Sequence, residues 1–253
     1  MRGHGVRFSP QGAGVVTMLD AWGNIRGLQI IRWRKPGQQA RRLEKEFWPA
    51  GLVKKGHFHQ LGMATGAPVI LVGEGYATCA SVFEATGLPV AVAFDAGNLA
   101  PVAAALHKRY KTAHILILAD DDAFSEGNPG VTCASAAAME VGGAYVAPVF
   151  ADEEARRAAY DAKGTKLSDF NDLHLLEGLH VVRAQVEARL LALGWRATQG
   201  AARAKQPQGG GVDPVNAPLR PIESLDELLE RYALVYGQGG TVFDHQEHCL
   251  VAL

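Results

Sequence analysis

The sequence predicts an α/β protein with a four-stranded, mainly parallel sheet flanked by helices, preceded by a small basic β-rich subdomain. Two observations support this fold class. From Pro68 onward, short continuous apolar runs alternate with helical segments, which is typical of parallel strands buried on both faces. Before residue 64, two apolar segments instead flank a loop that contains Gly and Asn, which is the pattern of a β-hairpin.

Residues 1–64 are expected to form the basic β-rich subdomain, with strands over 15–19 and 25–31 and two short segments near 42–47 and 56–61. Residues 1–62 hold 11 Lys and Arg against 3 acidic residues, a net charge of +8, interleaved with aromatic residues. This pattern suits a polyanion such as single-stranded nucleic acid, although the aromatic residues could equally form a small core. The candidate nucleic-acid contacts are Arg32, Arg34, Lys35, Arg41, Arg42, Lys54 and Lys55.

The segment 68–149 predicts alternating strands and helices that fold into a compact doubly wound core. The expected strands are 68–73, 89–94, 114–119 and 144–149. The expected helices are 77–86, 99–110 and 131–141, and glycines at 87 and 142–143 fit the ends of two of them.

A polar segment over 151–167 follows, then a helix that begins near Ser168 as its N-cap and a second helix over 181–193. With the core, these elements define one domain over 65–195. Residues 196–221 are rich in Ala, Gln, Gly and Pro and are expected to be a flexible linker. Residues 222–253 predict a short helix and two β segments, which either dock on the core or begin a further domain.

The composition, with 48% hydrophobic and 20% charged residues, favours a globular protein. No run approaches the roughly 20 apolar residues of a membrane span, so no membrane partner is expected. The start of the chain lacks the apolar core of a signal peptide. Three cysteines without a CxxC pair favour free thiols over a zinc ribbon or a disulfide framework, so a cytoplasmic location is expected.

Acidic side chains follow two of the predicted strands at the point where each strand ends. Glu74 comes directly after the first strand, and Asp120 and Asp122 follow the third. Ligands of open α/β sheets bind at the carboxyl ends of the strands, and positions i and i+2 of an extended segment point to one side. Asp121 should therefore point away as a solvated neighbour. Carboxylates this close repel unless a cation joins them, which predicts an Mg²⁺ or Mn²⁺ site suited to phosphoryl chemistry.

These residues resemble the Toprim domain of topoisomerases and primases. Glu74 within Gly73–Tyr76 and the pair Asp120-x-Asp122 match its acidic motifs. The sequence around these residues is most similar to primases of the bacterial, phage and mobile-element type. The segments 94–99 and 127–130 are also similar to that subgroup. The likeness spans roughly residues 14–180 and implies a Toprim-like sheet.

The resemblance implies a DNA primase, a nucleotidyltransferase that makes short RNA primers on a single-stranded DNA template from nucleoside triphosphates. A replicative helicase is a candidate partner. Asp120 and Asp122 would hold the metal, and Glu74 would complete the metal site or help to deprotonate the primer hydroxyl. Asp169 and Asp172 stand where primases carry a further acidic pair, but they are three residues apart instead of two, and Asn171 is an alternative to Asp172.

Four further residues are candidate nucleotide contacts: Asn98, Asn128, Lys163 and Lys166. Both asparagines also suit the Gly-containing turns in which they occur. Two other functions remain open, namely a Toprim nuclease that cleaves nucleic acid and a non-catalytic DNA-binding module. The cysteines of the zinc-binding domain that cellular primases carry and a helicase motor are both missing here. Either module could lie on flanking sequence or on a partner protein, so the sequence assigns no start-site choice.

Overall fold

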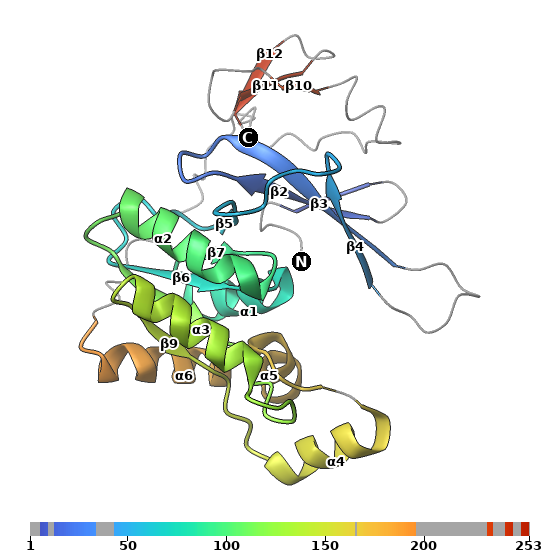
Figure 1. Cartoon of the computed structure of the whole chain (residues 1–253), viewed down its shortest axis with the longest axis vertical. Coiled ribbons are helices and arrows are strands. Elements are labelled where there is room, and N and C mark those ends of the chain that lie inside the picture. The colour runs from blue at the N-terminus through green and yellow to red at the C-terminus, as the bar shows by residue number, and fades with distance from the viewer. Residues whose placement is uncertain are drawn as a thin grey trace, which may run out of the picture. The chain divides into compact units, whose positions relative to one another are not determined.

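The computed structural model describes residues 6–9, 13–33, 43–164, 166–195, 232–234, 241–244 and 249–252 (Figure 1). The chain divides into two compact units, one over 54–202 and the other comprising 1–53 and 203–253. In the parts of the chain just given, none of the helices is long and apolar enough to cross a bilayer.

The N-terminal part carries an antiparallel four-stranded sheet in the order β1-β2-β3-β4. The strands are β1 (Arg7–Phe8), β2 (Gly14–Leu19), β3 (Ile25–Trp33) and β4 (Leu43–Trp48). Strands β2 and β3 form the hairpin that the sequence predicts. Burial alternates along β2, with Val16 and Met18 fully buried, because successive side chains of a strand face opposite sides of the sheet.

Asp20 fixes the turn between β2 and β3. Its Oδ1 accepts hydrogen bonds from the backbone N–H groups of Trp22 and Asn24 at 2.9 and 3.0 Å. Its Oδ2 accepts from Asn24 Nδ2 at 2.9 Å and from Arg26 Nη2 at 2.7 Å. Burial by itself raises the pKa of Asp20, but the hydrogen bonds from Asn24, Arg26 and Trp22 outweigh it and hold the pKa below its ordinary value of 3.8.

Replacing Asp20 with Asn is expected to lower the free energy of unfolding of this sheet by about 1–2 kcal/mol at pH 7, because charge-assisted bonds are lost. Because the pKa of Asp20 is lowered by folding, its contribution to folding stability is present above about pH 4. That contribution is lost as the pH falls through the pKa that Asp20 has in the folded protein. Urea unfolding of both proteins at pH 7 and pH 3 measures this difference. Equal losses at the two pH values would show that the charge is not responsible.

In the C-terminal part, the described residues form a second antiparallel sheet in the order β10-β11-β12. Its strands are β10 (Tyr232–Leu234), β11 (Thr241–Asp244) and β12 (Cys249–Ala252). The linker expected over 196–221 lies outside the described residues. So does the expected helix near 224–232, except for Tyr232, which begins β10.

The unit over 54–202 is built on a five-stranded sheet in the order β5-β7-β6-β8-β9. Its strands are β5 (His59–Leu61), β6 (Val69–Gly73), β7 (Val90–Val92), β8 (His114–Leu118) and β9 (Ala144–Val146). The last four run parallel, which confirms the predicted α/β class. The structure adds β5 as a fifth, antiparallel edge strand. The sequence assigns this segment to the N-terminal subdomain, because three residues carry too little periodicity to show where they pair.

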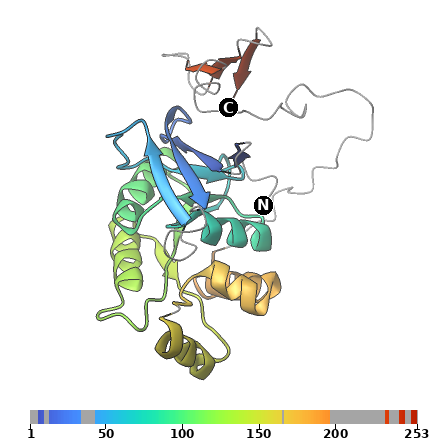
Figure 2. The same cartoon turned by 90° about the vertical axis from the view of Figure 1, so that its right-hand side faces the viewer.

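Helices cover both faces of this sheet. The α-helices of this unit are α1 (Tyr76–Thr86), α2 (Leu99–Arg109), α3 (Pro129–Glu140), α4 (Glu153–Lys163), α5 (Phe170–Glu177) and α6 (Leu179–Ala192). Helices α2 and α3 lie side by side on one face, and α1, α5 and α6 pack together on the other (Figures 1 and 2). The strands between them are almost entirely buried, which explains why they read as continuous apolar runs.

Two local features differ from the sequence-based expectation. The polar segment 151–167 contains helix α4, in which Arg156 is the one buried side chain over residues 153–162. Helix α5 begins after Asp169 as its N-cap, not after Ser168. Both differences bear on the acidic site described next.

Candidate functional site

The acidic residues gather where strands β6 and β8 end. Gly73, the last residue of β6, pairs with Leu118, the last residue of β8, so Glu74 and Asp120 leave the same edge of the sheet. The start of α5 joins them there, because the backbone N–H of Asp121 donates to Ser168 O at 2.7 Å. Three segments that are far apart in sequence therefore bring five carboxylates to one place: Glu74, Asp120, Asp122, Asp169 and Asp172.

Asp120 has the most perturbed carboxyl group of this set. Burial, followed by the charges of Asp169, Glu74, Asp122 and Asp172, raises its pKa to about 8. Its Oδ1 atom is buried and has no hydrogen-bond partner in the described part of the chain. A buried oxygen without a donor, among like charges, is suited to receive a cation.

Asp122 is oriented by the turn that leads into α3. Its Oδ2 accepts a hydrogen bond from the backbone N–H of Gly130 at 3.2 Å. Its own N–H donates to Asn128 Oδ1 at 3.0 Å. Asn128 has the left-handed backbone geometry (φ 41°) that asparagine tolerates, and its side chain also caps α3 by accepting from Val131 N.

Gly130 permits a close approach of α3 to the acidic loop. A Cβ atom at this position would lie 2.2 Å from the backbone oxygen of Asp120 and 2.9 Å from its carbonyl carbon. The contact is with backbone, which cannot rotate away as a flexible side chain can. The loop therefore keeps its position only while residue 130 is glycine.

Asp169 and Asp172 form a reciprocal capping box at the start of α5. Asp169 Oδ1 accepts from Asp172 N at 2.8 Å, and Asp172 Oδ2 accepts from the N–H groups of Ser168 and Asp169. Thr78 Oγ1, on α1, donates to Asp169 Oδ2 at 2.7 Å. The spacing of three residues is therefore the one a capping box requires.

Burial, and then the charge of Asp169, raises the pKa of Asp172, while backbone donors and the charge of Arg156 oppose the rise. Asp169 and Asp172 are thus held near Asp120, and the capping contacts fix where their carboxylates point.

The carboxylates fit a hard divalent cation by their chemistry, since Mg²⁺ and Mn²⁺ prefer oxygen ligands. Across the ranges that the structure describes, no group of three or more His, Cys, Asp or Glu side chains is arranged to hold a metal ion as it stands. The observation that favours a cation is the unpartnered Oδ1 of Asp120 beside Glu74 and Asp122.

The loop after β7 lies beside Glu74. Phe94, whose N–H donates to Glu74 O, has φ 72°, a strained conformation for a bulky residue. Asn98, predicted as a nucleotide contact, is buried. Its Oδ1 accepts from Gly56 N, and its Nδ2 donates to the carbonyls of His57 and Ala93. Its amide thus anchors the segment 56–57 to the edge of the sheet.

The other predicted contacts fall into three groups. Lys54 pairs with Asp95 at 2.6 Å, and Arg32 pairs with Glu46 on an exposed face of the N-terminal sheet. Lys55 is exposed, and exposed Lys166 donates to Ser125 Oγ at 3.2 Å. Four basic residues, Arg34, Lys35, Arg41 and Arg42, lie outside the described residues, as does the side chain of Lys163.

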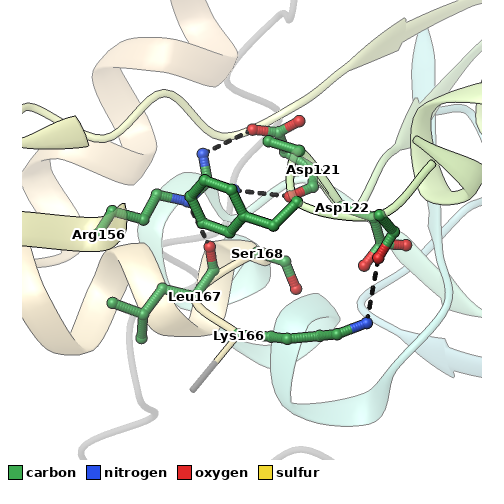
Figure 3. A pocket seen from close by; sticks show the side chains of 9 residues that line it. Asp121, Asp122, Arg156, Lys166, Leu167 and Ser168 are labelled. Carbon is green, nitrogen blue, oxygen red and sulfur yellow. Dashed lines mark hydrogen bonds and ion pairs between the residues drawn. The ribbon is translucent and has the colours of Figure 1, made fainter. Parts of the chain in front are cut away.

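Asp121, which the sequence suggests is a solvated neighbour, is instead only 21% exposed and pairs at 2.7 Å with Arg156, whose side chain is 2% exposed. Figure 3 shows the two facing each other beside a small pocket that Asp122, Lys166, Leu167 and Ser168 also line. Arg156 was missed because no sequence signal links it to a loop 35 residues earlier.

Residues 69–180 match the family described as the Toprim domain. Two curated relatives, both DNA primase TraC from Escherichia coli, are each 44% identical to this chain over 108 residues. That stretch is 40% of this chain and only 10% and 8% of the relatives. The chain therefore corresponds to a small part of either relative.

Among solved structures, the RNA polymerase domain of Mycobacterium tuberculosis primase DnaG, in complex with a double-stranded DNA oligomer with a 6-nucleotide overhang, is similar at 17% identity. The match covers 72% of this chain and 57% of that chain, with a TM-score of 0.39. The same domain without DNA matches at 15% identity over 80% of this chain and 71% of that chain, with a TM-score of 0.37. The fold assignment rests on the topology above and on the Toprim match.

Proposed function

Because residues 69–180 of this chain form a Toprim domain, we propose that the chain is the catalytic core of a DNA primase. It would synthesise short RNA primers on single-stranded DNA from nucleoside triphosphates. The observation that supports this most directly is the gathering of Glu74, Asp120 and Asp122 at one sheet edge, with Asp120 Oδ1 buried and lacking a donor among the described side chains.

Each acidic residue has a distinct role in this proposal. Asp120 and Asp122 would hold Mg²⁺ or Mn²⁺, with Asp169 and Asp172 adding negative charge or ligands from the start of α5. A bound cation would neutralise charge on the triphosphate and lower the pKa of the attacking primer hydroxyl. Glu74 would complete the metal site or accept the proton of that hydroxyl. Asp120 must release its own proton before it can bind the cation, because its pKa is raised to about 8.

The basic residues would bind the polyanionic substrates. Template contacts are proposed for the N-terminal basic residues, including Arg32, and for Lys54 and Lys55, where phosphate neutralisation makes binding salt-dependent. Lys166 and Lys163 would contact the incoming triphosphate. The two asparagines, Asn98 and Asn128, would act by shaping the adjacent loops, since their amide groups are engaged there. A replicative helicase is proposed as a partner.

A labelled single-stranded DNA template incubated with ribonucleotides and Mg²⁺ tests the proposal. New short RNA is expected, because the acidic edge should support nucleotide addition once a cation is bound. Chelation by EDTA should abolish synthesis, and excess Mg²⁺ or Mn²⁺ should restore it. Template binding should weaken by about 10-fold or more between 50 and 200 mM salt.

The same assay separates the competing functions. Shortened template without new RNA would identify a nuclease that uses the same carboxylates. Template binding with neither product would identify a non-catalytic DNA-binding module.

A further inference from the structure

Arg156, on helix α4, is a buried charge that the proposed mechanism does not use. Its Nε donates to Leu167 O at 2.6 Å, its Nη2 to Asp121 O at 2.6 Å, and its Nη1 to Asp121 Oδ2 at 2.7 Å. The guanidinium group also lies 5.2 Å from the ring centre of Phe124 and 4.6 Å from that of Phe150. A buried charge is costly unless it is paired and hydrogen-bonded, and these contacts satisfy that requirement.

These contacts join two separate segments of the acidic edge (Figure 3). Asp121 belongs to the loop that follows β8, and Leu167 lies two residues before the N-cap of α5. A backbone bond, from Asp121 N to Ser168 O, runs alongside the arginine. Arg156 is therefore a buried side chain that bridges the segment of Asp120 and Asp122 to the segment of Asp169 and Asp172, whereas the other side-chain link described above, from Lys166 to Ser125, comes from an exposed lysine.

The arginine also acts on the backbone of Asp122. The second oxygen of Asp121, Oδ1, accepts from Asn128 Nδ2 at 2.7 Å. Asn128 Oδ1 in turn accepts from Asp122 N. A continuous series of hydrogen bonds thus runs from Leu167 through Arg156, Asp121 and Asn128 to the backbone of Asp122.

We propose that Arg156 is a positioning residue that sets the separation between the carboxylates of 120–122 and those of 169–172, and thereby the affinity of the site for a divalent cation. The inference rests on the proposed metal-dependent function. The planar guanidinium donates in several fixed directions at once, which a lysine ammonium cannot reproduce. A substitution that keeps the positive charge should therefore still loosen the bridge.

The test compares Arg156→Lys with Arg157→Lys in the full chain. Arg157 is the matched control, because it is the next residue of α4 and also lies near the Phe124 ring, at 5.1 Å, but is 60% exposed and pairs with Asp161 on its own helix. In the metal-free protein, hydrogen exchange at the amides of Asp121, Asp122 and Asp172 is expected to accelerate together by about 10-fold in Arg156→Lys. The Mg²⁺ concentration for half-saturation, measured by calorimetry, should rise by about 10-fold. Arg157→Lys should match wild type in both measurements.

A purely structural role predicts another result: a lower melting temperature with unchanged exchange at these amides and unchanged half-saturation by Mg²⁺. That result would overturn the inference, as would an absence of Mg²⁺ binding by the wild type. If Arg156→Lys does not fold, Asp121→Asn provides the second variant. It should weaken Mg²⁺ binding to a similar degree, because it removes the carboxylate charge that Arg156 Nη1 pairs with while the arginine itself stays in place.

The two proposals can fail separately. A wild-type protein that binds Mg²⁺ but makes no primers would contradict the primase function and leave the role of Arg156 intact. Primer synthesis with the same Mg²⁺ requirement in Arg156→Lys and wild type would support the function and overturn the role of Arg156.

Discussion

Replacing Asp120 with Asn is expected to abolish primer synthesis and, at the same time, to stabilise the metal-free protein. Activity should fall by at least about 10²-fold, because a metal ligand supplies several kcal/mol of transition-state stabilisation. Stability should rise because folding places this carboxyl group among four others and raises its pKa to about 8. A gain on the order of a few kcal/mol at pH 7 corresponds to a melting temperature higher by about 4–10 °C.

The sign of the pH dependence follows from the raised pKa of Asp120. The folded protein binds this proton more tightly than the unfolded chain, so the associated stability is complete below about pH 4 and is lost as the pH rises through about 8. The melting temperature should therefore fall more steeply between pH 5 and pH 9 for wild type than for Asp120→Asn. Mg²⁺ should raise the melting temperature of wild type but not that of the variant.

Asp161→Asn is the control for this experiment, since it makes the same chemical change at a side chain of α4 that is 57% exposed. It should alter neither activity nor the response to Mg²⁺. An Asp120→Asn protein that is less stable than wild type at pH 8 would show that the carboxyl group is not under electrostatic strain.

Replacing Gly130 with Ala is expected to have the second largest effect. The new Cβ would stand 2.2 Å from the backbone oxygen of Asp120, so either the loop or the first turn of α3 must move. Overpacking of this kind costs about 1–3 kcal/mol, although alanine by itself favours a helix over glycine by about 1 kcal/mol. A displacement of Asp120 and Asp122 by about 1 Å should reduce primer synthesis by about 10²-fold.

Gly97→Ala is a suitable control, because a Cβ there would meet only Asp95 Oδ1, at an ordinary 3.4 Å. Thermal unfolding and primer synthesis of both variants measure the two effects. Wild-type activity and stability in Gly130→Ala would show that the acidic loop can shift without cost, and would remove the close approach as a requirement for the site.

The sheet was predictable because each parallel strand is buried on both faces. Segments 69–73 and 114–118 read as continuous apolar runs for that reason, and the acidic residues after them could be placed at one edge from topology alone. Strand β5 and helix α4 were not predictable. The first has three residues, and the second buries one arginine instead of an apolar stripe, so neither carries the periodic signal on which such predictions depend.

The candidate site was predictable only where local spacing decides geometry. The sequence placed Asp120, Asp121 and Asp122 directly after β8, but the partner of Asp121 depends on Arg156, which tertiary packing brings near. Likewise, Asp169 and Asp172 were recognised as an acidic pair, whereas their capping role required knowing that α5 starts after Asp169 and not after Ser168.

The division of the acidic site among three segments also affects biosynthesis. Glu74 is translated first, the aspartates after β8 follow, and α5 is translated last, after the whole sheet. Hydroxyl groups of α1 then hold α5 across about ninety residues, through Thr78 to Asp169 and Ser81 to Asn171. A nascent chain that has not yet released α5 from the ribosome therefore has a complete sheet but an incomplete set of acidic residues. It should lack catalytic activity until translation has passed this helix.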